Sequence, residues 1–301
     1  MKNNKVVSNL LIILLSIFII ISLLYFKSTY DKKVIPIKKK QENLEKLNKE
    51  SLKIKKDLKK EKEISKTIDL TEKDNLEKKE NLEKTLHEHQ VKAGVKVIYL
   101  TFDDGPSIYT EDILNILDKY NVKATFFVTC SDNLEALSKK IVEKGHTIAL
   151  HTCTHKYNQV YASDESYFED LNNISNLVEK YTGVKSKYIR FPGGSSNTVS
   201  RSYSRGIMSR LTNKVTENGY KYYDWNIDSN DAAGANSEQV YANVIGALQR
   251  SDRGTNMVLM HDVKVATKDA LDGIIKDALD MGYIFSNIND YTSEIHHGVN
   301  N

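Results

Sequence analysis

The part of the chain after residue 94 alternates short apolar runs with amphipathic segments, and this alternation restricts its fold more than any other feature. The apolar runs are rich in β-branched and aromatic residues, which is typical of buried strands. We expect strands at Val97–Phe102, Ala124–Thr129, His146–Leu150, Tyr188–Phe191, Tyr220–Trp225, Met257–Met260 and Tyr283–Phe285. Short apolar strands that alternate with helices predict a parallel α/β sheet, either open or closed into a barrel.

The segments between these runs place apolar residues at helical spacing. We expect helices at Glu111–Tyr120, Asn133–Lys144, Ser166–Tyr181, Val199–Asn218, Ser237–Arg250 and Thr267–Met281. Nearly all aromatic residues of the chain lie in this part, so the hydrophobic core belongs here. We therefore expect one globular domain over residues 94–301.

The chain before residue 94 has a different composition. A short basic N-terminus, 1–9, precedes Leu10–Phe26, which is apolar throughout except for two serines. This length lies at the low edge for a spanning helix, and no small-residue cleavage motif follows it, so we expect an uncleaved transmembrane anchor over 10–26. Lysine and glutamate dominate residues 27–93, which predicts a charged helical or disordered stalk without a core of its own.

Two arguments disagree about the side of the membrane on which the globular domain lies. The lysines at positions 27 to 40 outnumber those before the predicted anchor, and the positive-inside rule then places the domain in the cytoplasm. The chemistry of the site described next favours an extracellular domain, and we adopt that orientation. The formal net charge of +3 is small, so it gives no reason to expect a nucleic-acid partner.

Polar residues gather directly after the predicted strands. The clusters are Asp103-Asp104, His151–His155, Arg190–Gly194, Asp224–Asp231 and His261-Asp262. The carboxyl ends of parallel strands meet at one edge of an α/β sheet or barrel, where such folds build their sites. The sequence therefore predicts one functional site assembled from five separate segments.

His151 and His155 stand four residues apart, so a helical turn would place both imidazole rings on one side. Two histidines and one carboxylate form a metal site with positions left open for water and substrate. Neighbouring side chains of a strand point in opposite directions, so one of Asp103 and Asp104 could hold the metal while the other faces a water molecule. Histidines at this spacing are also common on surfaces, and Asp-Gly is an ordinary turn.

A metal-acidified water, a carboxylate base and a histidine acid together describe the hydrolysis of an amide or ester. His261 is the remaining candidate for the acid, although a histidine can also simply cap a strand. Arg190 could pair with an aspartate of the site and lower its pKa, or it could be a surface arginine before a glycine-rich turn. Trp225 could offer a flat apolar face to a sugar ring or belong to the core.

Five stretches of the chain resemble, in order, the motifs of a known family. They are T-F-D-D-G-P, H-T-x-x-H, R-F-P-G-G, D-W-N-I-D-S-N-D and L-M-H, spread over roughly Val97 to Phe285. They are similar to the five motifs of the polysaccharide deacetylases, the NodB-homology group of carbohydrate esterase family 4. The resemblance implies a deformed (β/α) barrel with about seven parallel strands. It also implies removal of N-acetyl groups from a polysaccharide with a divalent metal, usually zinc, with cobalt, nickel or manganese as alternatives.

The resemblance also implies roles for individual residues. Asp103 corresponds to the general base, and Arg190 to the residue that orients it. The metal ligands correspond to Asp104, His151 and His155. His261 corresponds to the general acid.

Asp231 corresponds to the carboxylate that sets the charge of His261, with Asp228 as the second choice. Leu259 and Trp225 correspond to residues that line the acetyl pocket. Relatives often have an aromatic residue where this chain has Gly193, and a backbone N–H would still serve there as the oxyanion donor.

A domain carried on an anchor and a long stalk favours peptidoglycan as substrate, with N-acetylglucosamine as the sugar. Alternative substrates are N-acetylmuramic acid, poly-N-acetylglucosamine, chitin oligomers and acetylxylan, and a non-catalytic wall-binding protein is the alternative outside enzymes. The sequence does not indicate an oligomeric state. Cys130 and Cys153 follow consecutive predicted strands; a disulfide between them suits an extracellular setting, whereas two reduced cysteines are the simpler expectation.

Overall fold

The protein is seen here in a computed structural model that describes residues 96–301 continuously. Before them it describes residues 15–17, 19–25, 27, 28, 31, 46, 47, 49–57, 59, 60, 74, 75, 78, 81, 84 and 94, and those from 15 to 84 are helical. The chain divides into two compact units, Met1–Glu80 and Asn81–Asn301. We call residues 96–301 the body.

Within the described residues, we find no helix that is both long enough and apolar enough to span a membrane. The predicted anchor, 10–26, and the predicted stalk, 27–93, lie partly outside the described residues. Both therefore stay predictions.

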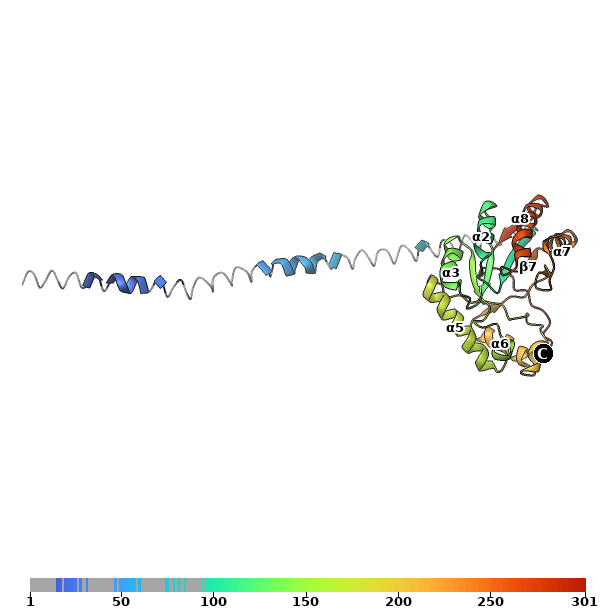
Figure 1. The fold of residues 1–301 in the computed structure, drawn as a ribbon, viewed down its shortest axis with the longest axis horizontal. Coiled ribbons are helices and arrows are strands. Elements are labelled where there is room, and N and C mark those ends of the chain that lie inside the picture. Colours follow the sequence, from blue (N-terminus) through green and yellow to red (C-terminus); the bar gives the residue numbers. More distant parts are fainter. Residues whose placement is uncertain are drawn as a thin grey trace, which may run out of the picture. The chain divides into compact units, whose positions relative to one another are not determined.

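The body is built on one sheet whose paired strands are all parallel (Figure 1). Its strands are β1 (Val97–Asp103), β2 (Thr125–Val128), β3 (Thr147–Leu150), β4 (Tyr188–Ile189), β5 (Lys221–Tyr222), β6 (Ile227–Asp228), β7 (Thr255–His261) and β8 (Ile284–Ser286). The strand order is β5-β4-β3-β2-β1-β7-β6, with β8 beside β1. In the body β5 and β6 do not pair with each other, so the sheet is an incomplete, deformed barrel. The parallel α/β prediction is confirmed, and β6 is the strand that the sequence did not reveal.

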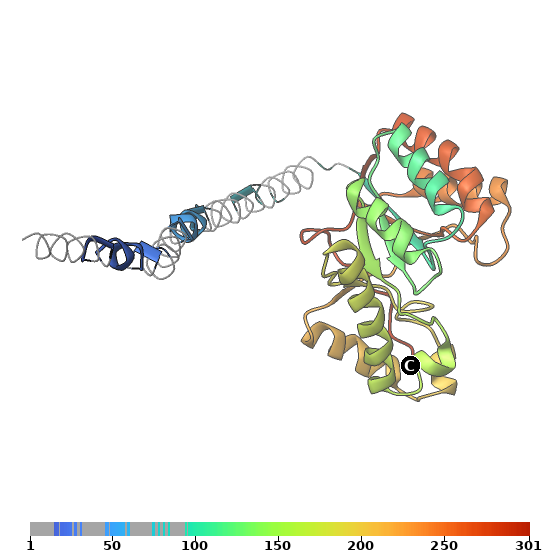
Figure 2. The ribbon, with the colours of Figure 1, turned by 60° about the vertical axis from the view of Figure 1, so that its left-hand side comes forward.

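Helices cover the outside of the sheet (Figure 2). They are α2 (Thr110–Lys119), α3 (Leu134–Glu143), α4 (Tyr157–Val160), α5 (Asp164–Thr182), α6 (Ile207–Glu217), α7 (Ser237–Arg250) and α8 (Val265–Asp280). Contacts run from α7 to α8, then to α2, α3, α5 and α6, which follows the order of the strands beneath. The helix expected over 199–218 is interrupted, because the left-handed Gly206 separates α6 from a short 3₁₀ helix at Val199–Ser202.

The two faces of β1 have different neighbours, and this difference places the site. Ile98, Leu100 and Phe102 join the large apolar cluster that includes the surrounding helices. Val97 and Tyr99 point the other way, into a smaller cluster with residues of neighbouring strands. Side chains alternate along a strand, so that second face continues through Thr101 to Asp103 at the carboxyl end. The site therefore rests on an apolar layer enclosed by the sheet.

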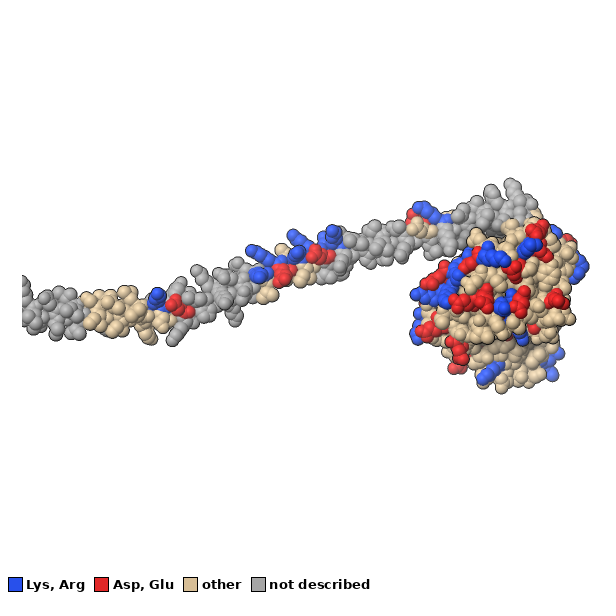
Figure 3. All heavy atoms as spheres, turned by 45° about the horizontal axis from the view of Figure 1, so that its top comes forward, with Lys and Arg blue, Asp and Glu red and all other residues tan. Residues whose placement is uncertain are grey.

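Basic and acidic side chains are interspersed on the face of the body seen in Figure 3. Ion pairs join neighbouring helices: Lys140 of α3 lies 2.5 Å from Glu111 of α2, and Lys119 of α2 lies 2.5 Å from Asp272 of α8. Exposed pairs of this kind contribute about 0–1 kcal/mol each. Apolar burial beneath the helices, rather than these pairs, holds them on the sheet.

Candidate active site

Asp103 and His261 are brought together by strand pairing. They end the adjacent parallel strands β1 and β7, and they stand opposite each other in the register. Leu259 stands two residues before His261 and is paired with Thr101 of β1. Because side chains alternate along a strand, Leu259 lies on the same face of β7 as His261. A carboxylate and an imidazole from distant parts of the chain thus share the carboxyl edge of the sheet, as the sequence predicted.

Asp104 departs from the strand geometry that the sequence suggested. Its φ of 72° is left-handed, which interrupts the alternation of side chains along β1. As a result, both neighbouring carboxylates reach the same ring: the Nε2 atom of His151 lies 3.7 Å from Asp103 Oδ2 and 3.5 Å from Asp104 Oδ1. The expectation that the two aspartates point in opposite directions is therefore wrong for this turn.

The two histidines do approach each other, but no helical turn brings them together. Residues 151–156 form an irregular loop between β3 and α4, with Thr152 at φ 70° and His155 at φ 54°. The two imidazole ring centres are 4.9 Å apart. Left-handed residues thus replace the expected helix, and they require neighbouring structure to hold them in place.

Asp104, His151 and His155 form a set of three groups that can hold a metal ion, with one donor atom from each within 4.8 Å of the others. Asp104 Oδ1 is buried and has no hydrogen-bond partner, although both imidazole Nε2 atoms lie about it at 3.5 and 3.4 Å. The Nδ1 atom of His151 lies 2.8 Å from the carbonyl oxygen of Arg190. A proton on Nδ1 leaves the Nε2 lone pair facing Asp104, which is the arrangement that metal-binding histidines adopt. These residues therefore fit a divalent metal.

Arg190 is buried, with 1% of its surface exposed, and it is not the surface arginine of the alternative prediction. Its NH1 group donates to Asp103 Oδ1 at 2.8 Å and to Thr101 Oγ1 at 2.7 Å. Its other nitrogens donate to the carbonyl oxygens of Tyr223 and Asp224. Burial raises the pKa of Asp103 above its ordinary value even though the Arg190 guanidinium acts to lower it. Arg190 therefore fixes the position of a carboxylate that retains affinity for a proton.

Asp231, and not Asp228, is the carboxylate beside His261. Its Oδ1 lies 2.8 Å from His261 Nδ1, and its Oδ2 accepts from the His261 backbone N–H at 2.6 Å. Burial acts to lower the pKa of His261, but the hydrogen bond to Asp231 and the charges of Asp103 and Asp231 outweigh it and raise that pKa to about 9. The imidazole is therefore protonated at neutral pH, as a proton donor must be. Asp228 is exposed on β6, where its carboxylate accepts from the N–H of Asn230.

Gly193 lies exposed in the loop after β4, at φ 75°. Its N–H has no acceptor among the described residues of the body, so the donor predicted for an oxyanion is free. The carboxylate of Asp224 fixes this loop by accepting from the backbone N–H and the hydroxyl of Ser195. Trp225 is half-buried, its ring packs against Gly194, and it lies 5.7 Å from the Arg190 guanidinium.

Tyr157 is a residue of the site that the sequence analysis missed. Its hydroxyl lies 2.3 Å from the point where a side chain on Gly193 would begin. Its ring packs edge-on against His155, with ring centres 5.8 Å apart. Tyr157 therefore fills the space above Gly193 from a different part of the chain. Its position two residues after the second motif histidine was the available signal.

The sequence placed Asp262, the residue after His261, at this edge of the sheet but assigned it no role. It is 1% exposed, its Oδ1 has no hydrogen-bond partner, and its Oδ2 accepts from Thr110 Oγ1 at 2.5 Å. A side chain on Gly105 would begin 2.1 Å from the carboxylate oxygens, so only glycine fits there. Burial raises the pKa of Asp262 to about 7. The carboxyl group therefore joins the end of β7 to the first residue of α2 and packs against Gly105 in the loop between β1 and α2.

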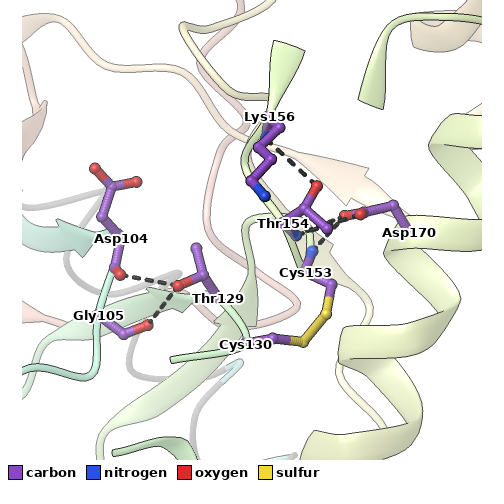
Figure 4. Close-up of a disulfide and its surroundings, with 8 residues drawn as sticks. All are labelled: Asp104, Gly105, Thr129, Cys130, Cys153, Thr154, Lys156 and Asp170. Atoms are coloured by element: carbon purple, nitrogen blue, oxygen red, sulfur yellow. Dashed lines mark hydrogen bonds between the residues drawn. A yellow bond between two sulfur atoms is a disulfide. The ribbon is translucent and has the colours of Figure 1, made fainter. Parts of the chain in front are cut away.

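Cys130 and Cys153 are joined in a disulfide (Figure 4). The simpler expectation of two reduced cysteines was therefore wrong. The backbone N–H of Cys130 also donates to the carbonyl oxygen of Cys153 at 3.0 Å, so two bonds connect the loops that follow β2 and β3.

The contact between Tyr157 and Gly193 leads to a prediction about stability. Gly193→Ala should lower the free energy of unfolding by about 1–3 kcal/mol, because it combines a left-handed backbone with overlap against the tyrosine hydroxyl. In a Tyr157→Phe background the same change should cost less, since the overlapping oxygen is gone. Urea unfolding of the four proteins in this cycle measures the difference, and equal costs in both backgrounds would contradict the contact.

Comparison with known proteins agrees with this geometry. The family model described as polysaccharide deacetylase matches residues 90–210. The chain is 34% identical over 213 residues to a peptidoglycan-N-acetylglucosamine deacetylase of Bacillus cereus, covering 68% of this chain and 72% of that one. It is 29% identical over 211 residues to the peptidoglycan-N-acetylmuramic acid deacetylase PdaA of Bacillus subtilis, covering 66% and 72%.

Among solved structures, the body is similar to the catalytic domain of a peptidoglycan N-acetylglucosamine deacetylase from Eubacterium rectale. The sequence identity is 45%, the TM-score is 0.67, and the match covers 68% of this chain and 94% of that domain. Sequence identity, fold and motif geometry agree, and the chain belongs to the polysaccharide deacetylase family.

Proposed function

We propose that this protein hydrolyses the N-acetyl groups of cell-wall polysaccharide, with N-acetylglucosamine of peptidoglycan as its substrate. The observation that supports this most directly is the pairing of Asp103 with His261 at the end of adjacent strands, beside three groups that fit a metal. An amide bond is cleaved by adding water to its carbonyl carbon and a proton to its nitrogen. The two paired residues match these two proton transfers.

Asp103 is the base that takes a proton from the attacking water. Its carboxylate is held by Arg190 at 2.8 Å, so it has one orientation, and burial favours its protonated form as the reaction proceeds. When bound, a divalent metal acidifies water and polarises the amide carbonyl. Asp104, His151 and His155 would hold that metal, and we propose zinc because the two imidazole nitrogens and one carboxylate suit it.

His261 is the acid that delivers a proton to the amide nitrogen as the carbon–nitrogen bond breaks, which releases acetate and leaves a free amine on the sugar. Asp231 holds the imidazole by Nδ1, so Nε2 remains to face the substrate. The backbone N–H of the exposed Gly193, which has no acceptor among the described residues of the body, would donate to the carbonyl oxygen of the amide. Leu259 and Trp225 form the apolar side of the acetyl pocket, and the half-buried indole offers a face to the sugar.

We further propose that the body lies outside the cell, attached through the anchor predicted at residues 10–26. The disulfide supports this, because such bonds persist in oxidising compartments and are rare in the cytosol. The relatives named for peptidoglycan support it as well, since that polymer is extracellular. The lysines after the predicted anchor argue against it, but we give the disulfide more weight, because a reducing compartment would keep the two cysteines as thiols.

The first prediction concerns the substrate. The purified full chain loaded with zinc should release acetate from peptidoglycan, and a chelator should abolish the release. Asp103→Asn should lower the rate at least about 100-fold, since it removes the base. Asp228→Asn is the matched control, because this exposed aspartate is not beside His261, and it should retain the wild-type rate.

Different substrates separate the alternatives in that assay. Release from N-acetylmuramic acid residues only, or from chitin oligomers only, would contradict N-acetylglucosamine of peptidoglycan while leaving a deacetylase. Absence of release from every acetylated glycan, with zinc bound, would contradict the enzyme and favour a wall-binding protein.

The second prediction concerns pH. Because the pKa of His261 is raised to about 9, the acid is protonated below that pH, and activity should fall as the pH rises through about 9. Asp231→Asn removes the charge and the proton acceptor that raise this pKa, so the alkaline limb should move to lower pH. Rate profiles of wild type, Asp231→Asn and Asp228→Asn measure the limb. An unmoved limb in Asp231→Asn would rule out His261 as the titrating acid.

The third prediction concerns location. Protease added to intact spheroplasts should digest residues 91–301, as followed by an antibody against the body, while a cytoplasmic marker protein remains intact. Protection of the body until the membrane is permeabilised would place it in the cytoplasm and contradict our orientation.

A further inference from the structure

The disulfide lies between the segments that supply the metal-binding groups (Figure 4). Cys153 stands two residues after His151 and two residues before His155. Cys130 follows β2, the strand between β1, which leads to Asp104, and β3, which leads to the histidines. We call residues 151–156 the histidine loop. The disulfide is thus attached to the middle of this loop.

The Cys130 side of the bond also holds the third metal-binding group. Thr129, the residue before Cys130, donates from its hydroxyl to the carbonyl oxygen of Asp104 at 2.9 Å. Its backbone N–H donates to the carbonyl oxygen of Gly105 at 2.8 Å. Figure 4 shows Thr129 facing the Asp104–Gly105 backbone on one side of the disulfide. The bond therefore joins the histidine loop to the segment that fixes the backbone of Asp104.

The histidine loop has little regular structure that could hold it without such a link. It includes two non-glycine residues in the left-handed region, Thr152 and His155, which persist only where surroundings determine them. At its start, His151 is held by hydrogen bonds to the carbonyl oxygens of Val128 and Arg190. In its middle, Cys130 N–H donates to the Cys153 carbonyl, and Asp170 Oδ1 accepts from the N–H groups of Cys153 and Thr154 at 2.5 and 3.1 Å. The contacts in the middle of the loop thus fall on Cys153 and on the residue after it, at the point where the disulfide is attached.

We propose that the Cys130–Cys153 disulfide is a positioning element of the metal site, so that metal affinity depends on its oxidation state. When the bond is intact, His151, His155 and Asp104 are held at the separation that one ion needs. When it is broken, the histidine loop loses its covalent link to Cys130, the neighbour of Thr129. The affinity of the site for the metal then falls, while the rest of the body stays folded. This inference rests on the metal site of the proposed function. It adds that this site binds its metal tightly only while the two cysteines are oxidised.

A phosphine can reduce the disulfide in the presence of water. A phosphine takes an oxygen atom from water and becomes a phosphine oxide, and the sulfur–sulfur bond accepts two electrons and two protons to give two thiols. A phosphine is preferred to a dithiol reagent, because dithiols bind zinc themselves.

The test measures zinc affinity in the full chain by competition with a chromogenic chelator. The variant Cys130→Ser/Cys153→Ser removes the bond and leaves no thiol that could bind zinc. We expect its zinc affinity to be at least about ten-fold weaker than that of the oxidised wild type, because the ligand groups must be ordered on binding. An affinity within about two-fold of wild type, in a variant that is folded by near-UV circular dichroism, would overturn the proposal.

A matched control separates positioning from general stability. Leu271→Ala creates a cavity beneath α8, a helix that packs mainly against α7 and α2 and carries none of the three metal-binding groups, and it should lower the melting temperature without removing a contact of those groups. Its zinc affinity should equal that of the wild type. If Leu271→Ala weakens zinc binding as much as the serine variant does at a similar loss of melting temperature, the disulfide has only a structural role and the proposal fails.

A second measurement keeps the test decisive if the serine variant does not fold. Titrating the wild type with a phosphine should lower zinc affinity before near-UV circular dichroism changes, whereas simultaneous loss of both would overturn the proposal. The oxidised wild type also separates this inference from the proposed function. If it fails to bind zinc, the metal site itself is wrong; if it binds zinc equally well before and after reduction, only the positioning role is wrong.

Discussion

The buried guanidinium of Arg190 is the contact on which the rest of the site depends. Its side chain holds Asp103, and its own carbonyl oxygen lies 2.8 Å from Nδ1 of His151, so one residue orients both the carboxylate and an imidazole of the candidate metal site. Removing one partner from a buried ion pair costs about 3–5 kcal/mol, because the other charge stays buried and unpaired. Here Thr101 and two backbone carbonyls accept hydrogen bonds from the same guanidinium, so all three of its nitrogens have an acceptor besides the charge of Asp103.

Side chains of the sheet surround the Arg190 guanidinium and exclude water from it. Tyr99 and Val97 form an apolar layer below the guanidinium, and Phe127 of β2 lies 4.2 Å from it, ring centre to guanidinium carbon. Exclusion of water strengthens the electrostatic interactions at the carboxyl edge of the sheet. The pKa values of Asp103 and His261 are both raised, but by different routes: desolvation raises that of the Asp103 carboxyl, whereas for His261 the hydrogen bond to Asp231 and the nearby carboxylate charges outweigh desolvation, which acts to lower it. Two titratable groups in register thus favour opposite roles in proton transfer.

The sequence was a good guide to which segments form the site, and a poor guide to loop conformation. Strand ends could be located because apolar runs stop abruptly at polar clusters, as at Asp103 and His261. The conformation of Asp104 and His155 could not be predicted, because a positive φ is uncommon in any residue other than glycine and the sequence around them does not require it. Tyr157 was missed for a related reason. It contacts Gly193, which lies in a different part of the chain, and the sequence around either residue does not indicate that the two meet.

By itself the sequence determined the alternation of strands and helices, the gathering of five motifs at one edge, and the residues that we propose for the chemistry. Those features depend on neighbouring or regularly spaced residues, so they can be recognised from the sequence alone. Only the tertiary structure decided that Asp231 rather than Asp228 meets His261, that Asp103 and His261 stand in register, and that Cys130 bonds to Cys153. These outcomes depend on how distant segments pack and on backbone angles in irregular loops, which no single stretch of sequence specifies.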